Sequence, residues 1–163
     1  MNNIEEALND LLRKNVDAAK GFEKAAEEVS SPTLQSIFKE KAQVRIQFAK
    51  TLSSEIAMHG EAPEIEGNLK GDIHRIWMDI RAAISTQEDE TIIAECIRGE
   101  EGALEEYDSV LEEAELYATT RALILNQKAA VQKTLQKLHD LEGRGTQRTS
   151  AAYEPQALPT TMK

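Results

Sequence analysis

Four polar residues interrupt the apolar repeats that otherwise mark the buried faces of helices. The first repeat contains Asn15, the second Arg45, the third Glu100 and the fourth Gln127, each near the middle of its repeat. If four helices pack side by side at equal height, these side chains meet in one central layer. Because an unpaired buried charge is very costly, Arg45 and Glu100 are predicted to pair, and the two amides to satisfy the remaining hydrogen-bonding groups.

A carboxylate in this central layer could instead coordinate a metal ion. Di-iron and di-manganese centres in four-helix bundles use a Glu from each of two helices and a Glu-x-x-His from each of the other two. The spacing of three puts both ligands on one helical face. This sequence contains no Glu-x-x-His. The carboxylates that remain as candidate ligands are Asp17, Glu23, Glu55, Glu100 and Glu101.

The histidines closest to that pattern stand at helix ends. Glu55 and His59 are four residues apart, and His139 follows Gln136, an amide in place of the required carboxylate. Those two ends are expected at opposite poles of the bundle, and the central arginine would repel a divalent cation. A structural ion-pair layer is therefore the favoured interpretation. No catalytic residue and no cofactor is assigned, and iron or manganese is kept as the alternative.

The first two predicted helices form a hairpin. Apolar residues recur at steps of three and four over residues 3–29 and again over residues 32–59. Ser31 and Pro32 are typical of a helix start, as N-cap and first-turn proline, and Gly60 is typical of a helix end. Because the link is so short, these helices are expected to be antiparallel neighbours.

The third and fourth predicted helices form a second hairpin. The third begins with a capping box, either Ser85 with Glu88 or Thr86 with Asp89, and runs to about residue 114. After a short break, the fourth continues until Gly143, which is expected to close it. The tail, residues 143–163, has no sustained period and is expected to be flexible, so the domains are a bundle at 1–142 and a tail at 143–163.

The connection between the hairpins decides the topology. Residues 60–87 include a short amphipathic repeat that carries Trp77 on its apolar face. Each long helix would extend about 40 Å at 1.5 Å per residue, and this connection is long enough to recross that length. The third helix would then run parallel to the second. The predicted fold class is all-α, a ferritin-like four-helix bundle with a long helix-containing crossover between helices two and three.

The composition of the chain narrows its expected cellular location and its expected binding partners. The chain has 163 residues and a formal net charge of −10, which argues against nucleic-acid or anionic-membrane binding. No secretory signal or membrane-spanning run is present in the sequence, and Cys96 is a single cysteine, so a cytoplasmic location is expected. We expect a homo-oligomer, with a dimer favoured. A protein partner could bind through the tail or the acidic third helix, although a solvated face explains that acidic run more simply.

Three stretches resemble a known bacterial family. They are residues 15–25 (NVDAAKGFEKA), residues 74–77 (HRIW) and residues 98–101 (RGEE), followed by Tyr107. The sequence from about residue 4 to residue 141 is similar to a family of domains of unknown function in the ferritin-like superfamily. The resemblance implies a four-helix ferritin-like fold in a bacterial cytoplasm. It implies no activity, so it carries no catalytic residue to this chain.

Three functional hypotheses follow from these observations. The first is an uncharacterised ferritin-like bundle with a non-enzymatic structural, stress-related or scaffold role, because the core is complete and the site is not. The second is a metal-binding protein or oxidase with a non-standard carboxylate ligand set. The third is an adaptor that binds a basic partner through the tail or the acidic third helix.

Overall fold

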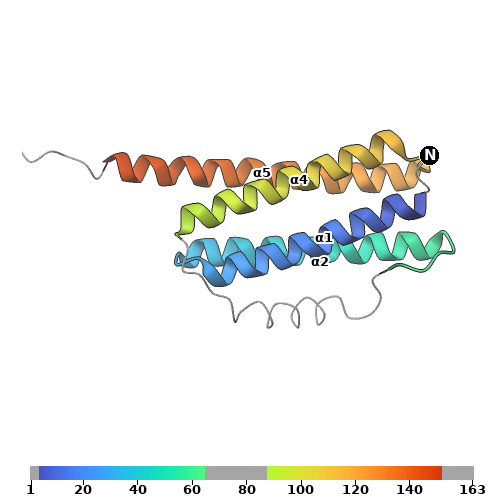
Figure 1. Cartoon of the computed structure of the whole chain (residues 1–163), viewed down its shortest axis with the longest axis horizontal. Helices are drawn as coiled ribbons and strands as arrows, with labels where there is room; N and C mark the ends of the chain where they lie inside the picture. The colour runs from blue at the N-terminus through green and yellow to red at the C-terminus, as the bar shows by residue number, and fades with distance from the viewer. Residues whose placement is uncertain (1–3, 65–87, 152–163) are drawn as a thin grey trace, which may run out of the picture.

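The computed structural model describes residues 4–64 and 88–151, with the backbone alone described beyond residue 144 (Figure 1). Its four helices are α1 (Ile4–Glu28), α2 (Pro32–Met58), α4 (Asp89–Glu113) and α5 (Ala118–Ala151). The four long helices of the sequence prediction are therefore present. None of these four is long and apolar enough to cross a membrane. The short helix expected within the crossover, together with its Trp77, lies outside the described residues.

The helices form two antiparallel hairpins, α1 with α2 and α4 with α5 (Figure 1). Contacts of α1 with α4 and of α2 with α5 close the bundle. Because α4 starts at the pole where α2 starts, the two helices run in parallel, and the chain must recross the bundle between them. This is the ferritin-like arrangement that the long connection predicted.

The hairpin turn between α1 and α2 has the chemistry expected from its sequence. The Ser31 hydroxyl accepts a hydrogen bond from the backbone N–H of Leu34 at 3.4 Å, and Pro32 opens the helix. At the other end, Gly60 adopts φ +83°, a left-handed conformation that side chains with a Cβ rarely take. Both signals fix the length of α2, and thus the height of Arg45.

The start of α4 differs from the predicted capping box, whose Ser85 and Thr86 lie outside the described residues. Its N-cap residue is Glu88, and that side chain makes no capping hydrogen bond. The carboxylate of Asp89 instead accepts hydrogen bonds from the backbone N–H groups of Ser30 and Ser31, at 2.7 and 3.1 Å. Asp89 thereby ties the start of α4 to the α1–α2 turn, a long-range contact that competes with local capping.

The end of α5 also differs from prediction. We expected Gly143 to close the helix, but α5 continues to Ala151 and extends past the ends of the other three helices (Figure 1). Glycine in a helix costs only about 1 kcal/mol relative to alanine, so it permits a helix end without requiring one. The domain boundary at residue 143 stays a prediction, and residues 152–163 lie outside the described part.

Two apolar clusters fill the bundle. One contains Leu8, Leu12, Ile46 and Val131 and lies toward the start of α1. The other contains Phe22, Phe38, Ile97 and Leu138 and lies toward the α1–α2 turn. Between them, α2 and α4 each place a charged residue in the interior. The central layer is thus a polar boundary between two halves of the core.

Candidate functional site

Arg45 and Glu100 form an ion pair in the middle of the bundle. One guanidinium nitrogen of Arg45 donates to Glu100 Oε1 at 2.5 Å, and the two side chains are 3% and 1% exposed. The other terminal nitrogen donates to Asn15 Oδ1 at 2.7 Å. Arg45 therefore joins α2 to α1 and α4 at one height, as the heptad positions predicted.

The remaining polar groups of the layer form a chain of hydrogen bonds. Asn15 Nδ2 donates to the Leu11 carbonyl and to the Tyr107 hydroxyl, both at 2.8 Å. Tyr107 in turn donates to Gln127 Oε1 at 2.8 Å, and Gln127 Nε2 donates to the Phe48 carbonyl at 3.3 Å. The layer consequently connects all four described helices. Burial raises the pKa of Tyr107 to about 12, so its hydroxyl keeps its proton for this bond.

Glu100 is incompletely satisfied. Its Oε2 is the one buried side-chain nitrogen or oxygen in the described part of the chain that lacks a hydrogen-bond partner. Desolvation raises the pKa of Glu100 above its ordinary value, while the charge and hydrogen bond of Arg45, and the charge of Lys41, act in the opposite direction. The carboxylate is therefore held by one strong contact and retains a free acceptor.

The candidate ligands do not converge on a metal ion. Within residues 4–64 and 88–144, no three His, Cys, Asp or Glu side chains are grouped so that they could hold one. Asp17 and Glu101 are exposed, Glu23 is half-buried, and Glu55 lies ten residues beyond Arg45, about 15 Å along α2. At the centre, Glu100 stands against a guanidinium. Within the described ranges, the candidate ligands therefore do not form the ligand set of a di-metal carboxylate centre.

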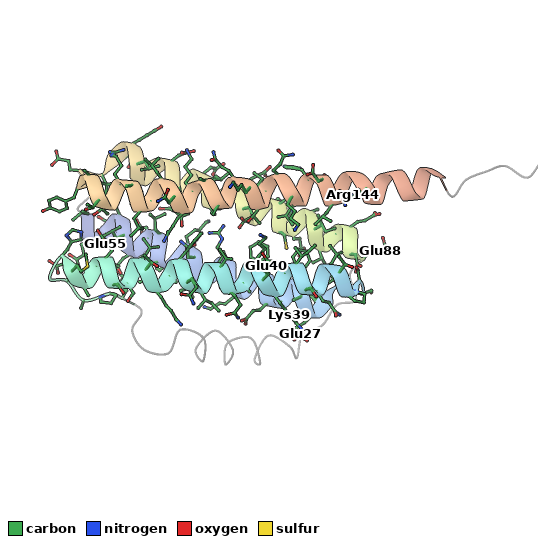
Figure 2. The ribbon with its side chains drawn as sticks, turned by 180° about the vertical axis from the view of Figure 1, so that it is seen from behind. Glu27, Lys39, Glu40, Glu55, Glu88 and Arg144 are labelled. Carbon is green, nitrogen blue, oxygen red and sulfur yellow. The ribbon has the colours of Figure 1, made fainter. Side chains whose placement is uncertain are left out.

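A second polar cluster lies where α2 ends and α5 begins (Figure 2). The hydroxyl of Thr120 donates to Glu55 Oε1 at 2.5 Å, and both residues are buried. His59 Nε2 lies 3.3 Å from the same oxygen and 3.4 Å from the Thr120 hydroxyl. The imidazole stacks on the Tyr117 ring with centroids 5.1 Å apart. Glu55 and His59 thus pair with each other and with α5, and no third ligand joins them among the described residues.

Cys96 stands one helical turn before Glu100 and is half-buried. Burial raises the pKa of its thiol from 9.0 to about 12, and the negative charge of Glu100 adds to the shift. Since the thiolate is the reactive form, this cysteine is a poor nucleophile near neutral pH. It is a small, partly buried residue that packs against the apolar cluster nearer the α1–α2 turn.

Two members of these clusters were missed in the sequence. Tyr107 fits the apolar repeat of the third helix, so its sequence position does not reveal that its hydroxyl is bonded, although a buried tyrosine hydroxyl usually finds a hydrogen-bond partner. Thr120 had no distinguishing signal, because its role depends on how the start of α5 meets the end of α2. The other four layer residues interrupt apolar repeats, which is a signal that sequence alone displays.

Comparisons with known proteins identify a family and a fold. A family model described as "Domain of unknown function (DUF2383)" matches residues 3–113. No curated protein matches the sequence at a significant level. Among solved structures, the tetragonal form of Mycobacterium smegmatis Dps is similar over 83% of this chain and 84% of that chain, with a TM-score of 0.62. At 16% identity, that likeness shows a shared four-helix fold and nothing about activity.

Proposed function

The chain belongs to this family of domains of unknown function, and we propose that it works as a non-enzymatic helical bundle with a scaffold or stress-related role in the bacterial cytoplasm. In this role the bundle presents its surface to other molecules, and its interior serves to fix the register of the helices. Among the described residues, no three His, Cys, Asp or Glu side chains are grouped so that they could hold a metal ion.

The observation that carries this proposal is the position of Arg45. In a ferritin-like bundle that uses a di-metal centre, inward-pointing carboxylates meet near the middle of the helices. Here a guanidinium occupies that position and is bonded to Glu100 and Asn15. A fixed positive charge at the centre opposes binding of a divalent metal ion there, and a bonded polar layer specifies which helices align.

Elemental analysis tests the proposal. The protein would be purified without chelators or metal-affinity steps after growth in medium enriched in iron and manganese. We expect far less than one metal ion per chain and no acceleration of ferrous oxidation over a protein-free control. Near-stoichiometric iron or manganese that is lost in Glu100→Gln or Glu55→Gln, together with ferrous oxidation, would overturn the proposal.

A metal-binding role is the second candidate, because one observation favours it. Glu100 Oε2 has no partner among the described residues, and Glu100 and Asp17 both line a pocket between α1 and α4. Such a site would use a non-standard carboxylate set, with Glu23, Glu55 or Glu101 recruited by side-chain movement. Metal content that falls in Asp17→Asn but is unchanged in Glu55→Gln would place the ion in this pocket rather than at the pole.

Self-association is part of the scaffold proposal. The large hydrophobic side chains exposed in the described part are Met58, Tyr117 and Leu125, at 76%, 63% and 48%. Two of them lie at the pole where α2 ends and α5 begins, so a contact there would cover apolar surface. Light scattering after gel filtration should give a dimer that dissociates in Met58→Lys with Tyr117→Lys. A dimer unaffected by this double substitution would place the interface elsewhere.

A further inference from the structure

A pocket of about 330 Å³ opens between the second half of α1 and the first half of α4. This volume lies within the range of roughly 300–1,000 Å³ that is typical of small-molecule sites. Phe22 and Ile92 supply apolar walls, and Gly21 and Gly99 border the space. A methyl group placed on either glycine would meet nothing within 4 Å among the described residues outside its own stretch of helix. The two glycines therefore leave the space open.

Glu100 links this pocket to the central layer. Its side chain lines the pocket and is 1% exposed, with Oε1 bonded to Arg45 and Oε2 without a partner in the described part of the chain. A buried carboxylate oxygen without a hydrogen bond is destabilising, and a donor that enters the pocket would relieve this. A ligand that carries a hydrogen-bond donor would therefore suit this pocket better than one that has only acceptors.

The charged residues around the pocket indicate which sign of charge a bound molecule should carry. The acids among its lining residues are Asp17, Glu28, Glu95 and Glu100, against the bases Lys14 and Lys24. Lys24 is already paired with Glu28 at 3.7 Å. The lining therefore carries a formal charge of −2, or −1 when the Arg45 guanidinium bonded to Glu100 is counted with it. This net negative charge favours a cation over a neutral molecule and a neutral molecule over an anion.

We propose that this pocket binds a small amphipathic amine, whose ammonium group donates to Glu100 Oε2 and whose apolar body packs against Phe22 and Ile92. The apolar walls supply affinity for the body, and the orphaned carboxylate oxygen orients the charged end. This binding activity goes beyond the scaffold role, because it requires neither self-association nor metal.

Three small molecules that differ only in their polar end test whether the pocket prefers an ammonium group. 2-Phenylethylamine carries an aromatic body and an ammonium group at neutral pH, 2-phenylethanol replaces the ammonium with a hydroxyl, and 3-phenylpropanoate carries a negative charge. Isothermal titration calorimetry on the full chain at pH 7 should show saturable binding of the amine. We expect its affinity to exceed that of the alcohol by at least tenfold, with no measurable binding of the carboxylate.

Two pocket-filling variants test the location. Gly99→Leu and Gly21→Leu place a side chain in open space on a helix, where leucine is a better helix former than glycine, so both should fold. Each should weaken amine binding at least tenfold. Gly143→Leu is the matched control, because it makes the same change in similarly open space on α5, away from the pocket, and should bind as the wild type does.

Glu100→Gln tests the orienting group. It keeps an acceptor oxygen and removes the charge, so the preference for the amine over the alcohol should fall toward one. If this variant unfolds, the two glycine variants still decide the proposal. Three results would overturn it: no binding of the amine at 10 mM, equal affinity for the amine and the alcohol, or unchanged binding in folded Gly99→Leu and Gly21→Leu. None of these results depends on metal content or oligomeric state.

Discussion

Two buried glutamates of this bundle are held in different ways. Glu100 lies in the central layer against the guanidinium of Arg45, and its second oxygen has no partner among the described residues. Glu55 lies near the pole, where a hydroxyl and an imidazole bind one of its oxygens. A glutamate with a fixed cation is part of a charged pair, whereas one with a hydroxyl and an imidazole belongs to a weaker, adaptable contact. The first three experiments below test that difference, and the fourth compares the buried ion pair with an exposed one.

The largest effect is expected from Arg45→Met. It removes the cation but leaves the Glu100 carboxylate in the interior, so the free energy of unfolding should fall by about 3–5 kcal/mol at pH 7. Urea denaturation followed by circular dichroism measures the loss. The double variant Arg45→Met with Glu100→Gln should recover much of it, because no buried charge then remains. A loss below about 1 kcal/mol in the single variant would contradict a structural role for the pair.

Thr120→Val should have a smaller effect at the pole. Valine has nearly the same shape but cannot donate to Glu55, and a hydrogen bond to a charged group contributes about 1.5–3 kcal/mol. The same urea titration measures this loss. Thr51→Val is the matched control, since its hydroxyl is exposed and bonds the Gln47 carbonyl of its own helix. If Thr120→Val lowered the free energy of unfolding as much as Arg45→Met does, the two glutamates would not differ in how strongly they are held.

The third prediction concerns how the stability of Glu100→Gln, relative to that of the wild type, changes with pH. Burial raises the pKa of Glu100 above 4.5, so the folded state binds more protons than the unfolded state between 4.5 and the folded pKa. The contribution of Glu100 is thus complete below about pH 4.5 and is lost as pH rises through the folded pKa. The stability of Glu100→Gln relative to the wild type should therefore increase from about pH 4 to about pH 8.

Urea titrations of both proteins across this pH range check the slope, and Glu101→Gln on the exposed neighbour controls for the loss of one carboxylate. The opposite trend would mean that the bond from Arg45 outweighs the desolvation of Glu100. In that case the central pair would be a net source of stability at neutral pH, and the contrast with Glu55 would be larger.

The smallest effect is expected at the surface. Lys128 on α5 forms an ion pair with Asp108 on α4, and the Asp108 side chain is 50% exposed. Lys128→Met should lower the free energy of unfolding by about 0.2–1 kcal/mol, because solvent screens exposed charges. The difference should shrink further in about 1 M salt, as urea titrations at both ionic strengths would measure. If Lys128→Met lowered the free energy of unfolding as much as Arg45→Met does, burial would not explain the difference between the exposed and the buried ion pair.

Most residues of the central polar layer could be predicted from the sequence, because a polar residue at a core heptad position must find a partner. Arg45 and Glu100 could be paired on that ground alone. Tyr107 could not be assigned to the network, since a tyrosine fits an apolar stripe whether or not its hydroxyl is bonded. The contact between Thr120 and Glu55 was also beyond prediction, because nothing local in either helix requires the other.

Local signals by themselves determined where most helices begin and end. Ser31 with Pro32 and the left-handed Gly60 fix α2, because capping and φ preferences act within a few residues. The same reasoning failed at Gly143, where α5 continues, and at Asp89, which binds the neighbouring turn instead of capping its own helix. Where a distant partner competes with a local one, sequence cannot rank the two.

The sequence alone therefore determined four helices, their pairing into hairpins and the presence of a polar centre, since periodicity, capping and loop length are properties of the chain itself. The tertiary structure decided which oxygen of Glu100 is bonded, that no three of the candidate metal ligands come together, and that a pocket lies between α1 and α4. Those features depend on how side chains from separate helices share a small volume, and that geometry exists only after the helices pack.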